Sequence, residues 1–214
     1  MNRLMAVVLS IAAFAIVVGG VTAASAAPGD GPGMGHAAIL GFAVRAGGRF
    51  DNVRMCVATP AGVKGGPAAD ISVFADVAVS DKASLRVNIP LMRPILFAAA
   101  FTMLQLEPEI GLIFRKRNEG GVDLVGGPTL GLSFHYGPDY RSESSGAGRS
   151  PSFFAMGPQV GGYLGLDFKR PGERFNFQLG LSPYVAPLFG VDDPGEHRGV
   201  VVGGMLDAWF RFST

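Results

Sequence analysis

The chain has 214 residues, which suits a single domain. Its 18 Lys and Arg residues nearly balance 17 Asp and Glu, and the net charge of +1 argues against a nucleic-acid-binding surface. Charged residues make up only 16% of the chain, against about 25% in soluble domains. The single cysteine, Cys56, cannot form an internal disulfide bond.

The N-terminal residues predict a cleaved secretory signal peptide over 1–26. Arg3 precedes an almost wholly apolar stretch, 4–18, and Ala24-Ser25-Ala26 forms an A-x-A cleavage site. The apolar stretch is short for an uncleaved membrane anchor, which needs about 20 residues. Residues 27–36 are rich in Gly and Pro and predict a flexible lead-in. The folded domain is then expected over 37–214.

The rest of the chain alternates between apolar residues and small or polar ones, most clearly from residue 103 onward. In 103–115, for example, Leu104, Ile110 and Leu112 share one face, while Gln105 and Glu109 share the other. A period of two over ten residues predicts a long β-strand with a different environment on each face. Eight strands are expected, over 37–49, 71–79, 84–91, 103–115, 122–136, 153–169, 175–189 and 200–213.

The connections between these strands alternate in length. Three are short, and the four longer ones span 51–70, 92–102, 137–152 and 190–199. Short periplasmic turns and longer outer loops are typical of outer-membrane barrels. An even strand count then puts both termini on the periplasmic side. Two loop assignments stay open: 52–58 could add a strand segment, and the apolar stretch within 92–102 could extend the strands, dip into lipid or cover the barrel mouth.

The direction of the apolar face distinguishes a membrane barrel from a soluble eight-stranded ligand carrier, whose apolar face points inward. Aromatic residues of the apolar face gather near both ends of the strands, as in the girdles of membrane barrels. The polar face is rich in glycine, such as Gly131, Gly165 and Gly180, as a narrow lumen requires. These features favour an apolar exterior.

Proline recurs within the predicted strands. Pro108, Pro128, Pro158 and Pro183 each begin a Pro-x-apolar-small pattern in which proline falls on the apolar face. Because proline removes a donor from the strand ladder, we expect bulges or bends at these positions.

The segment 37–214 resembles the small eight-stranded outer-membrane barrels, the class of outer-membrane protein A-type and W-type domains. The hairpin over 79–91 is similar to one in barrels linked to transport of hydrophobic compounds. Phe210 and Phe212 resemble a C-terminal assembly signal, although Ser213 and Thr214 follow the last aromatic residue. The resemblance implies an all-β, eight-stranded antiparallel up-and-down barrel in the bacterial outer membrane. Its implied partners are membrane lipid, lipopolysaccharide and the barrel assembly machinery, and a monomer is expected.

Charged residues on the polar face predict an ion-pair network inside the barrel, because buried charges need partners. We expect Arg45 and Arg86 to lie near Glu107 and Glu109. Eight strands leave space for side chains but not for an open pore. Disruption of the pairs would open a narrow polar path, so these residues are also gate candidates. The set is Arg45, Asp76, Arg86, Glu107, Glu109, Arg115, Asp207 and Arg211.

Two further groups are weighed as sites. Ser133 and His135 share the inward face near the predicted outer end of their strand. This pair leaves a lipid hydrolase as an alternative function, although no acidic partner is evident from the sequence. Acidic residues and His197 in the last loop show no recognisable metal-ligand spacing and predict a solvated loop. No catalytic residue, metal or cofactor is therefore assigned. The first hypothesis is a non-enzymatic barrel with a structural or surface-interaction role. The second is binding or transport of a small molecule, with hydrophobic molecules among the candidates.

Overall fold

The computed structural model describes residues 38–51, 65–93, 95, 104–138, 152–168, 175–191 and 197–212. The predicted signal peptide and lead-in, Cys56, the segment 52–58 and the acidic part of the last loop lie outside these residues. In the described part of the chain, no helix is both long and apolar enough to cross a membrane. The strands are β1 (Ala38–Asp51), β2 (Gly65–Ser80), β3 (Ala83–Pro90), β4 (Leu104–Leu106), β5 (Glu109–Lys116), β6 (Val122–Pro138), β7 (Ser152–Phe168), β8 (Phe175–Gly190) and β9 (His197–Phe212).

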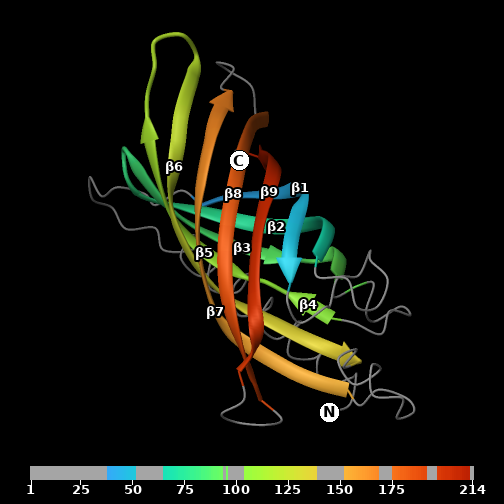
Figure 1. The fold of residues 1–214 in the computed structure, drawn as a ribbon. Helices are drawn as coiled ribbons and strands as arrows, with labels where there is room; N and C mark the ends of the chain where they lie inside the picture. Colours follow the sequence, from blue (N-terminus) through green and yellow to red (C-terminus); the bar gives the residue numbers. More distant parts are fainter. Residues whose placement is uncertain are drawn as a thin grey trace.

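The strands form a closed ring in which every pairing is antiparallel (Figure 1). Chain-order neighbours pair, except that β3 pairs with β5 and β4 pairs only with β6, and β1 pairs with β9 to close the ring. Both β4 and β5 pair with β6, so these two segments act as one interrupted strand and the ring has eight members. The predicted eight-stranded antiparallel barrel is confirmed.

The interruption between β4 and β5 falls at Glu107 and Pro108, inside the strand predicted over 103–115. Proline has no N–H to donate to a neighbouring strand. Its carbonyl is still used, because the Leu132 N–H donates to Pro108 O at 3.1 Å. The predicted irregularity therefore occurs at this proline.

The other three prolines leave the strand register unchanged, so no bulge occurs there, although the pairing of β5 with β6 skips Pro128 and the pairing of β7 with β8 skips Pro158 and Pro183. Pairing of β6 with β7 runs unbroken through Pro128 and Pro158. The β8–β9 register is likewise unaltered at Pro183. Within the described strands, register shifts occur elsewhere, between Ala78 and Ser80 and between Leu188 and Phe189.

Two strand boundaries also differ from the prediction. β2 begins at Gly65, six residues before the predicted start at 71, and Gly65 pairs with Phe50 of β1. The early part of β2 contains mostly small residues, so it shows no apolar alternation. At the same open end of the β2–β3 hairpin, β3 stops at Pro90, one residue before its predicted end at 91, and the chain makes a helical turn in which the Ile95 N–H donates to Leu91 O at 3.1 Å. The described residues just after β3 therefore do not extend the strand.

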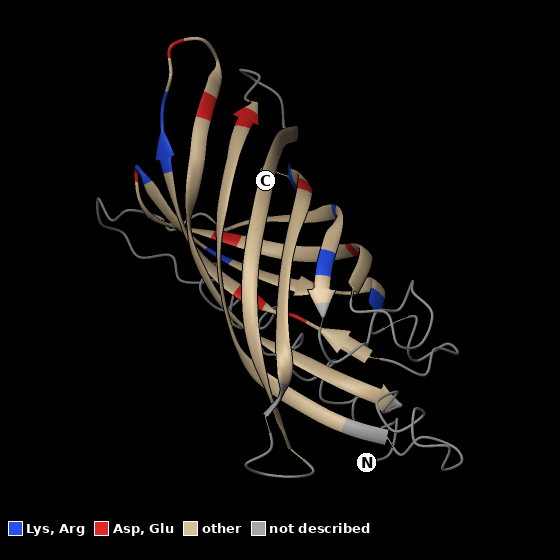
Figure 2. Cartoon of the chain, viewed as in Figure 1, with Lys and Arg blue, Asp and Glu red and all other residues tan. Residues whose placement is uncertain are grey.

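The outward face of the barrel is apolar. Its most exposed side chains include Leu130 and Leu206, at 63% and 65% of their full accessible area. Leu112 and Leu132 are also exposed, whereas Asp167 and Gln178 are fully buried inside. Figure 2 shows charged residues as isolated bands along otherwise uncharged strands. The barrel therefore has the polarity opposite to that of a soluble carrier, as predicted.

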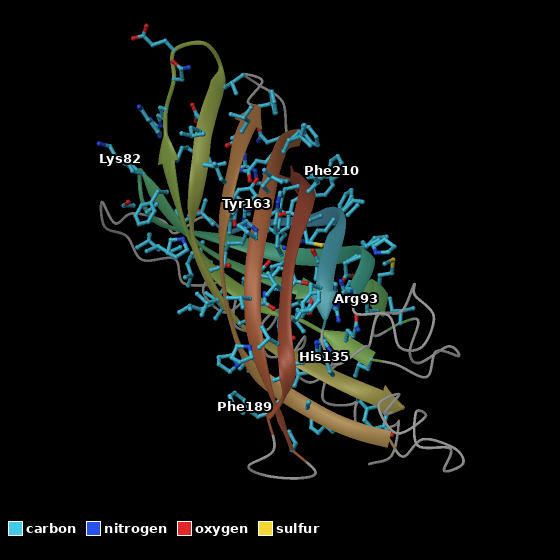
Figure 3. The ribbon with its side chains drawn as sticks, in the orientation of Figure 1. Lys82, Arg93, His135, Tyr163, Phe189 and Phe210 are labelled. Atoms are coloured by element: carbon cyan, nitrogen blue, oxygen red, sulfur yellow. The ribbon has the colours of Figure 1, made fainter. Side chains whose placement is uncertain are left out.

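Aromatic side chains form a continuous outward cluster near the end of the barrel where β9 finishes. Phe42 stacks on Phe210 at 4.7 Å between ring centroids, and Phe177 lies 5.3 Å from Phe210. Phe168 stacks on Phe177 at 5.9 Å, so the cluster crosses from β1 through β9 and β8 to β7. Phe189 is exposed at the opposite end (Figure 3). The placement fits the predicted aromatic girdles, and Phe42 of β1 belongs to the cluster.

Glycine on the inward face makes room for large side chains. A Cβ atom at Gly180 would lie 2.4 Å from the Tyr163 ring, and one at Gly203 would lie 2.5 Å from the Tyr184 ring. Tyr163 also packs edge-on against Trp209 at 5.8 Å, and Phe74 packs against the same indole at 4.9 Å. The lumen is therefore filled by side chains at this level.

Candidate functional site

The lumen holds the predicted site residues. Seven of the eight are buried inward, and the Arg115 side chain is 26% exposed near the end of β5. In the described part of the lumen, six arginines face seven carboxylates, so the charges nearly cancel. The arginines are Arg45, Arg49, Arg86, Arg93, Arg115 and Arg211, and the carboxylates are those of Asp70, Asp76, Glu107, Glu109, Asp123, Asp167 and Asp207.

Toward the barrel end opposite the β2–β3 turn, Glu107 joins two arginines. Its Oε1 lies 3.1 Å from Nη1 of Arg49, and its Oε2 lies 2.9 Å from Nη1 of Arg93. Arg93 also lies 3.3 Å from Asp70. These contacts tie β1, β2 and the segment after β3 to the break between β4 and β5. Sequence reasoning missed Arg49, Arg93 and Asp70 as partners. Arg93 and Asp70 fell in predicted loops. Arg49 follows Arg45 by four residues on the same predicted strand, so the alternation could have placed it inward.

Below this layer, Arg45 bridges Glu109 and Asp207. Its Nη1 lies 2.8 Å from Glu109, and its Nε donates to Asp207 Oδ1 at 2.9 Å. The strand register explains the second contact, since Arg45 stands directly opposite Asp207 across the β1–β9 seam. Asn88 donates to Glu109 at 3.0 Å, and the Ser182 hydroxyl donates to Asp207.

Arg86 forms the next layer. Its guanidinium donates to both oxygens of Asp76, at 2.7 and 2.8 Å, and to Gln178 Oε1 at 2.9 Å. Its central carbon lies 4.3 Å from the Trp209 ring centroid and 5.4 Å from that of Tyr163. The sequence analysis placed Arg86 near Glu107 and Glu109, but its ion-pair partner is Asp76. Asp76 stands opposite Arg86 in the β2–β3 register, which brings the pair together.

At the end where β9 finishes, Asp167 holds two arginines. It contacts Arg211 closely and lies 2.9 Å from Nη2 of Arg115. Asp123, opposite Asp167 in the β6–β7 register, lies 3.9 Å from Arg115 and accepts from the Asn118 backbone N–H at 3.1 Å. The charges thus form successive layers along the lumen.

Ser133 and His135 are fully buried and lie beside Glu107. The Ser133 Oγ is 3.0 Å from His135 Nε2, and the same Nε2 is 3.8 Å from Glu107 Oε1. An acidic partner therefore exists, which the sequence analysis did not find. In a catalytic triad the acid instead contacts the ring nitrogen that does not face serine. Both side chains point inward, so this geometry does not support a hydrolase at the lipid-facing rim.

Two of the cavities lined by described residues lie within the lumen, and Arg86 lines both. The larger, about 100 Å³, opens at the end formed by the β2–β3 turn and is lined by Asp76, Arg86, Gln178 and Arg211 among others. The smaller, about 10 Å³, is lined by Arg86, Glu109 and Trp209 among others. Among the described residues, no group of three or more His, Cys, Asp or Glu side chains is arranged to hold a metal ion.

The fold and its polarity define an eight-stranded β-barrel with an ion-paired interior. Among solved structures it is similar to the crystal structure of Neisserial surface protein A, with a TM-score of 0.51 and 13% identity. The likeness covers 83% of this chain and 96% of that chain, and at this identity it establishes the fold alone. No protein-family model and no curated protein sequence matches the chain.

Proposed function

We propose that this chain is an integral barrel of the bacterial outer membrane, exported with loss of residues 1–26 and inserted through the domain at 37–214. The observation that carries the proposal is the inverted polarity of the barrel. Leu130, Leu164 and Leu206 are more than half exposed on the outside, while charges are paired inside. Water would not favour a continuous apolar belt of this size, whereas acyl chains would.

The proposed role is structural or surface-interacting and does not involve catalysis. Layers of ion pairs and aromatic rings fill the lumen, which leaves the outer loops as the surface available to partners. The likeness to a protein named as a bacterial surface protein supports this interpretation. Lipid and lipopolysaccharide would surround a monomeric barrel, and the assembly machinery would insert it.

Membrane fractionation combined with a heat-modifiability gel tests the proposal. The protein should sediment with outer membranes, and unheated samples should migrate differently from boiled ones because the closed barrel resists detergent unfolding. A soluble periplasmic protein is fractionated in parallel as the control. It shows how much soluble protein sediments because it is trapped inside membrane vesicles. Recovery of this chain in the soluble periplasmic fraction would refute the membrane assignment.

A second candidate function is passage of a small molecule or ion through the lumen. The observation that favours it is that Arg86 lines both internal cavities. The layer around Arg86 thus separates the larger cavity, which opens at one end of the barrel, from the smaller cavity deeper in the lumen. Asp76 lies in the same layer as Arg86, and the other predicted gate residues lie in the layers on either side of it.

A further inference from the structure

The larger cavity has an unusual balance of hydrogen-bonding groups. Four basic residues line it against two acidic ones: Lys82, Arg86, Arg115 and Arg211 against Asp76 and Asp81. Lys82 stands at the tip of the β2–β3 turn, far from Phe189 at the opposite barrel end (Figure 3). The cavity therefore opens at the end of the barrel that the membrane orientation places in the periplasm.

Of the two acidic side chains that line the cavity, Asp81 lies exposed in the β2–β3 turn and Asp76 is already engaged. Both oxygens of Asp76 accept from Arg86. Asp167, which lies behind the cavity wall, contacts Arg211 and Arg115. These pairs neutralise much of the basic charge, and they also leave few acceptors for other donors.

Donors in the wall, by contrast, remain without acceptors. Gln178 is fully buried, and its Oε1 accepts a hydrogen bond from Arg86. Its Nε2 is therefore a donor. No acceptor for this Nε2 is found in the described structure. The Nε of Arg211, a side chain that is also buried, has no acceptor there either. Buried donors without acceptors are costly, at roughly 1–3 kcal/mol each. A group that brings oxygen acceptors would satisfy them.

From this geometry we propose that the cavity is a binding site for a small oxyanion, of the phosphate or sulfate class. Its volume of about 100 Å³ exceeds the space that one water molecule requires, which is roughly 10–15 Å³. Both donor atoms are closed off from water, so the Gln178 and Arg211 side chains would turn toward the cavity to donate to the oxyanion, with Lys82 at the rim adding positive charge. The ligand could be a free ion or the phosphate of a lipid headgroup, since both present the same oxygens.

Equilibrium dialysis of radiolabelled inorganic phosphate against the folded protein in detergent micelles tests the site. The wild-type protein should bind one phosphate per chain, and sulfate should compete. Gln178→Glu should weaken binding at least about tenfold, because it keeps an acceptor for Arg86 but replaces the free donor by a negative charge. Lys82→Gln should weaken binding by a smaller factor.

Lys116→Gln is the matched control, since Lys116 is an exposed lysine at the same end of the barrel but outside the cavity lining. Its affinity should equal that of the wild type, and a heat-modifiability gel should show that each variant is folded. Competition by glycerol phosphate would show that the site accepts a headgroup-like monoester, and its failure would restrict the site to the free ion. Absence of phosphate and sulfate binding by the wild type would overturn the proposal. The proposal would also be overturned if folded Gln178→Glu bound phosphate with wild-type affinity. If Gln178→Glu does not fold, wild-type phosphate affinity in Lys82→Gln would overturn it.

Discussion

Arg86 makes hydrogen bonds to two residues in the lumen and lies over three aromatic rings. It pairs with Asp76 through two hydrogen bonds and lies over the ring of Trp209. Removal of one partner from a buried ion pair costs about 3–5 kcal/mol, and a desolvated cation–π contact adds up to about 2 kcal/mol. The contacts therefore hold the side chain firmly between the two cavities.

Substitution of Arg86 by alanine tests whether this layer closes a polar path. Because Arg86 lines both cavities, Arg86→Ala should join them and give measurable single-channel conductance in planar lipid bilayers. The wild-type barrel should stay closed or nearly closed. Conductance should fall again in Arg86→Lys, since lysine restores bulk and charge at the same place.

Arg49→Ala provides the matched control for this experiment. Arg49 is also buried and paired with a carboxylate, but it does not line either cavity. Its loss should leave the trace closed. If Arg86→Ala is folded and shows no more conductance than Arg49→Ala, the second candidate function is wrong and this layer does not close a polar path.

The inward position of these residues was predictable from the period of two, but their partners were not. Arg45 and Arg86 both fall on the polar face of their predicted strands, and both lie inside. Which carboxylate each one meets depends on the strand register. The bulge between Ala78 and Ser80 shifts the register of the β2–β3 hairpin and brings Asp76 opposite Arg86. No sequence pattern locates that bulge.

At the scale of the strands, the alternating faces determine which changes the barrel tolerates. The centre of β6 exposes Leu130 beside Val160 of β7, and Val185 of β8 and Val202 of β9 continue the same outward row. In the proposed membrane placement, a charge on this row would have to enter the hydrocarbon, whereas a charge near a strand end can reach water.

Leu130→Arg should therefore destabilise the folded barrel by about 2–4 kcal/mol, the cost of arginine near the bilayer midplane. The free energy of unfolding can be measured by reversible denaturation in lipid vesicles. Val79→Arg is the control, because Val79 is similarly exposed but lies near the end of β2. Its cost should be about 0–1 kcal/mol. Equal costs at the two positions would contradict the proposed placement of the barrel in the membrane.

The strands that alternate strongly were predictable, and those made of small residues were not. β6 and β7 carry leucine, valine and phenylalanine at every second position over much of their length, and their predicted bounds agree with the structure to within two residues. The segment from Gly65 to Asp70 pairs just as regularly with β1, but its small side chains give no periodic signal. Backbone pairing with Arg49 and Phe50 holds it in the sheet.

At the scale of the whole molecule, the fold depends on the contact between its first and last strands. β1 and β9 pair over twelve residues, from Leu40 opposite Phe212 to Asp51 opposite Val201. This pairing removes both edges of the sheet, which would otherwise invite association with other chains. It also places Arg45 against Asp207, so ring closure completes the layer of charges around Arg45. A period of two cannot show that a sheet closes, because it carries no information about which strands meet.

An engineered disulfide bond tests ring closure and register together. Ala46 and Leu206 are outward-facing and directly opposite across the seam, and such pairs have Cα atoms about 4.5–5.5 Å apart, within reach of a disulfide. With Cys56 changed to serine, Ala46→Cys with Leu206→Cys should form an intramolecular bond on oxidation, visible as a mobility change in a boiled, non-reducing gel. The control Ala46→Cys with Leu164→Cys should not, because β8 and β9 separate those positions. Failure of the first pair to cross-link in folded protein, or equal cross-linking of both, would mean that β1 and β9 do not meet in this register.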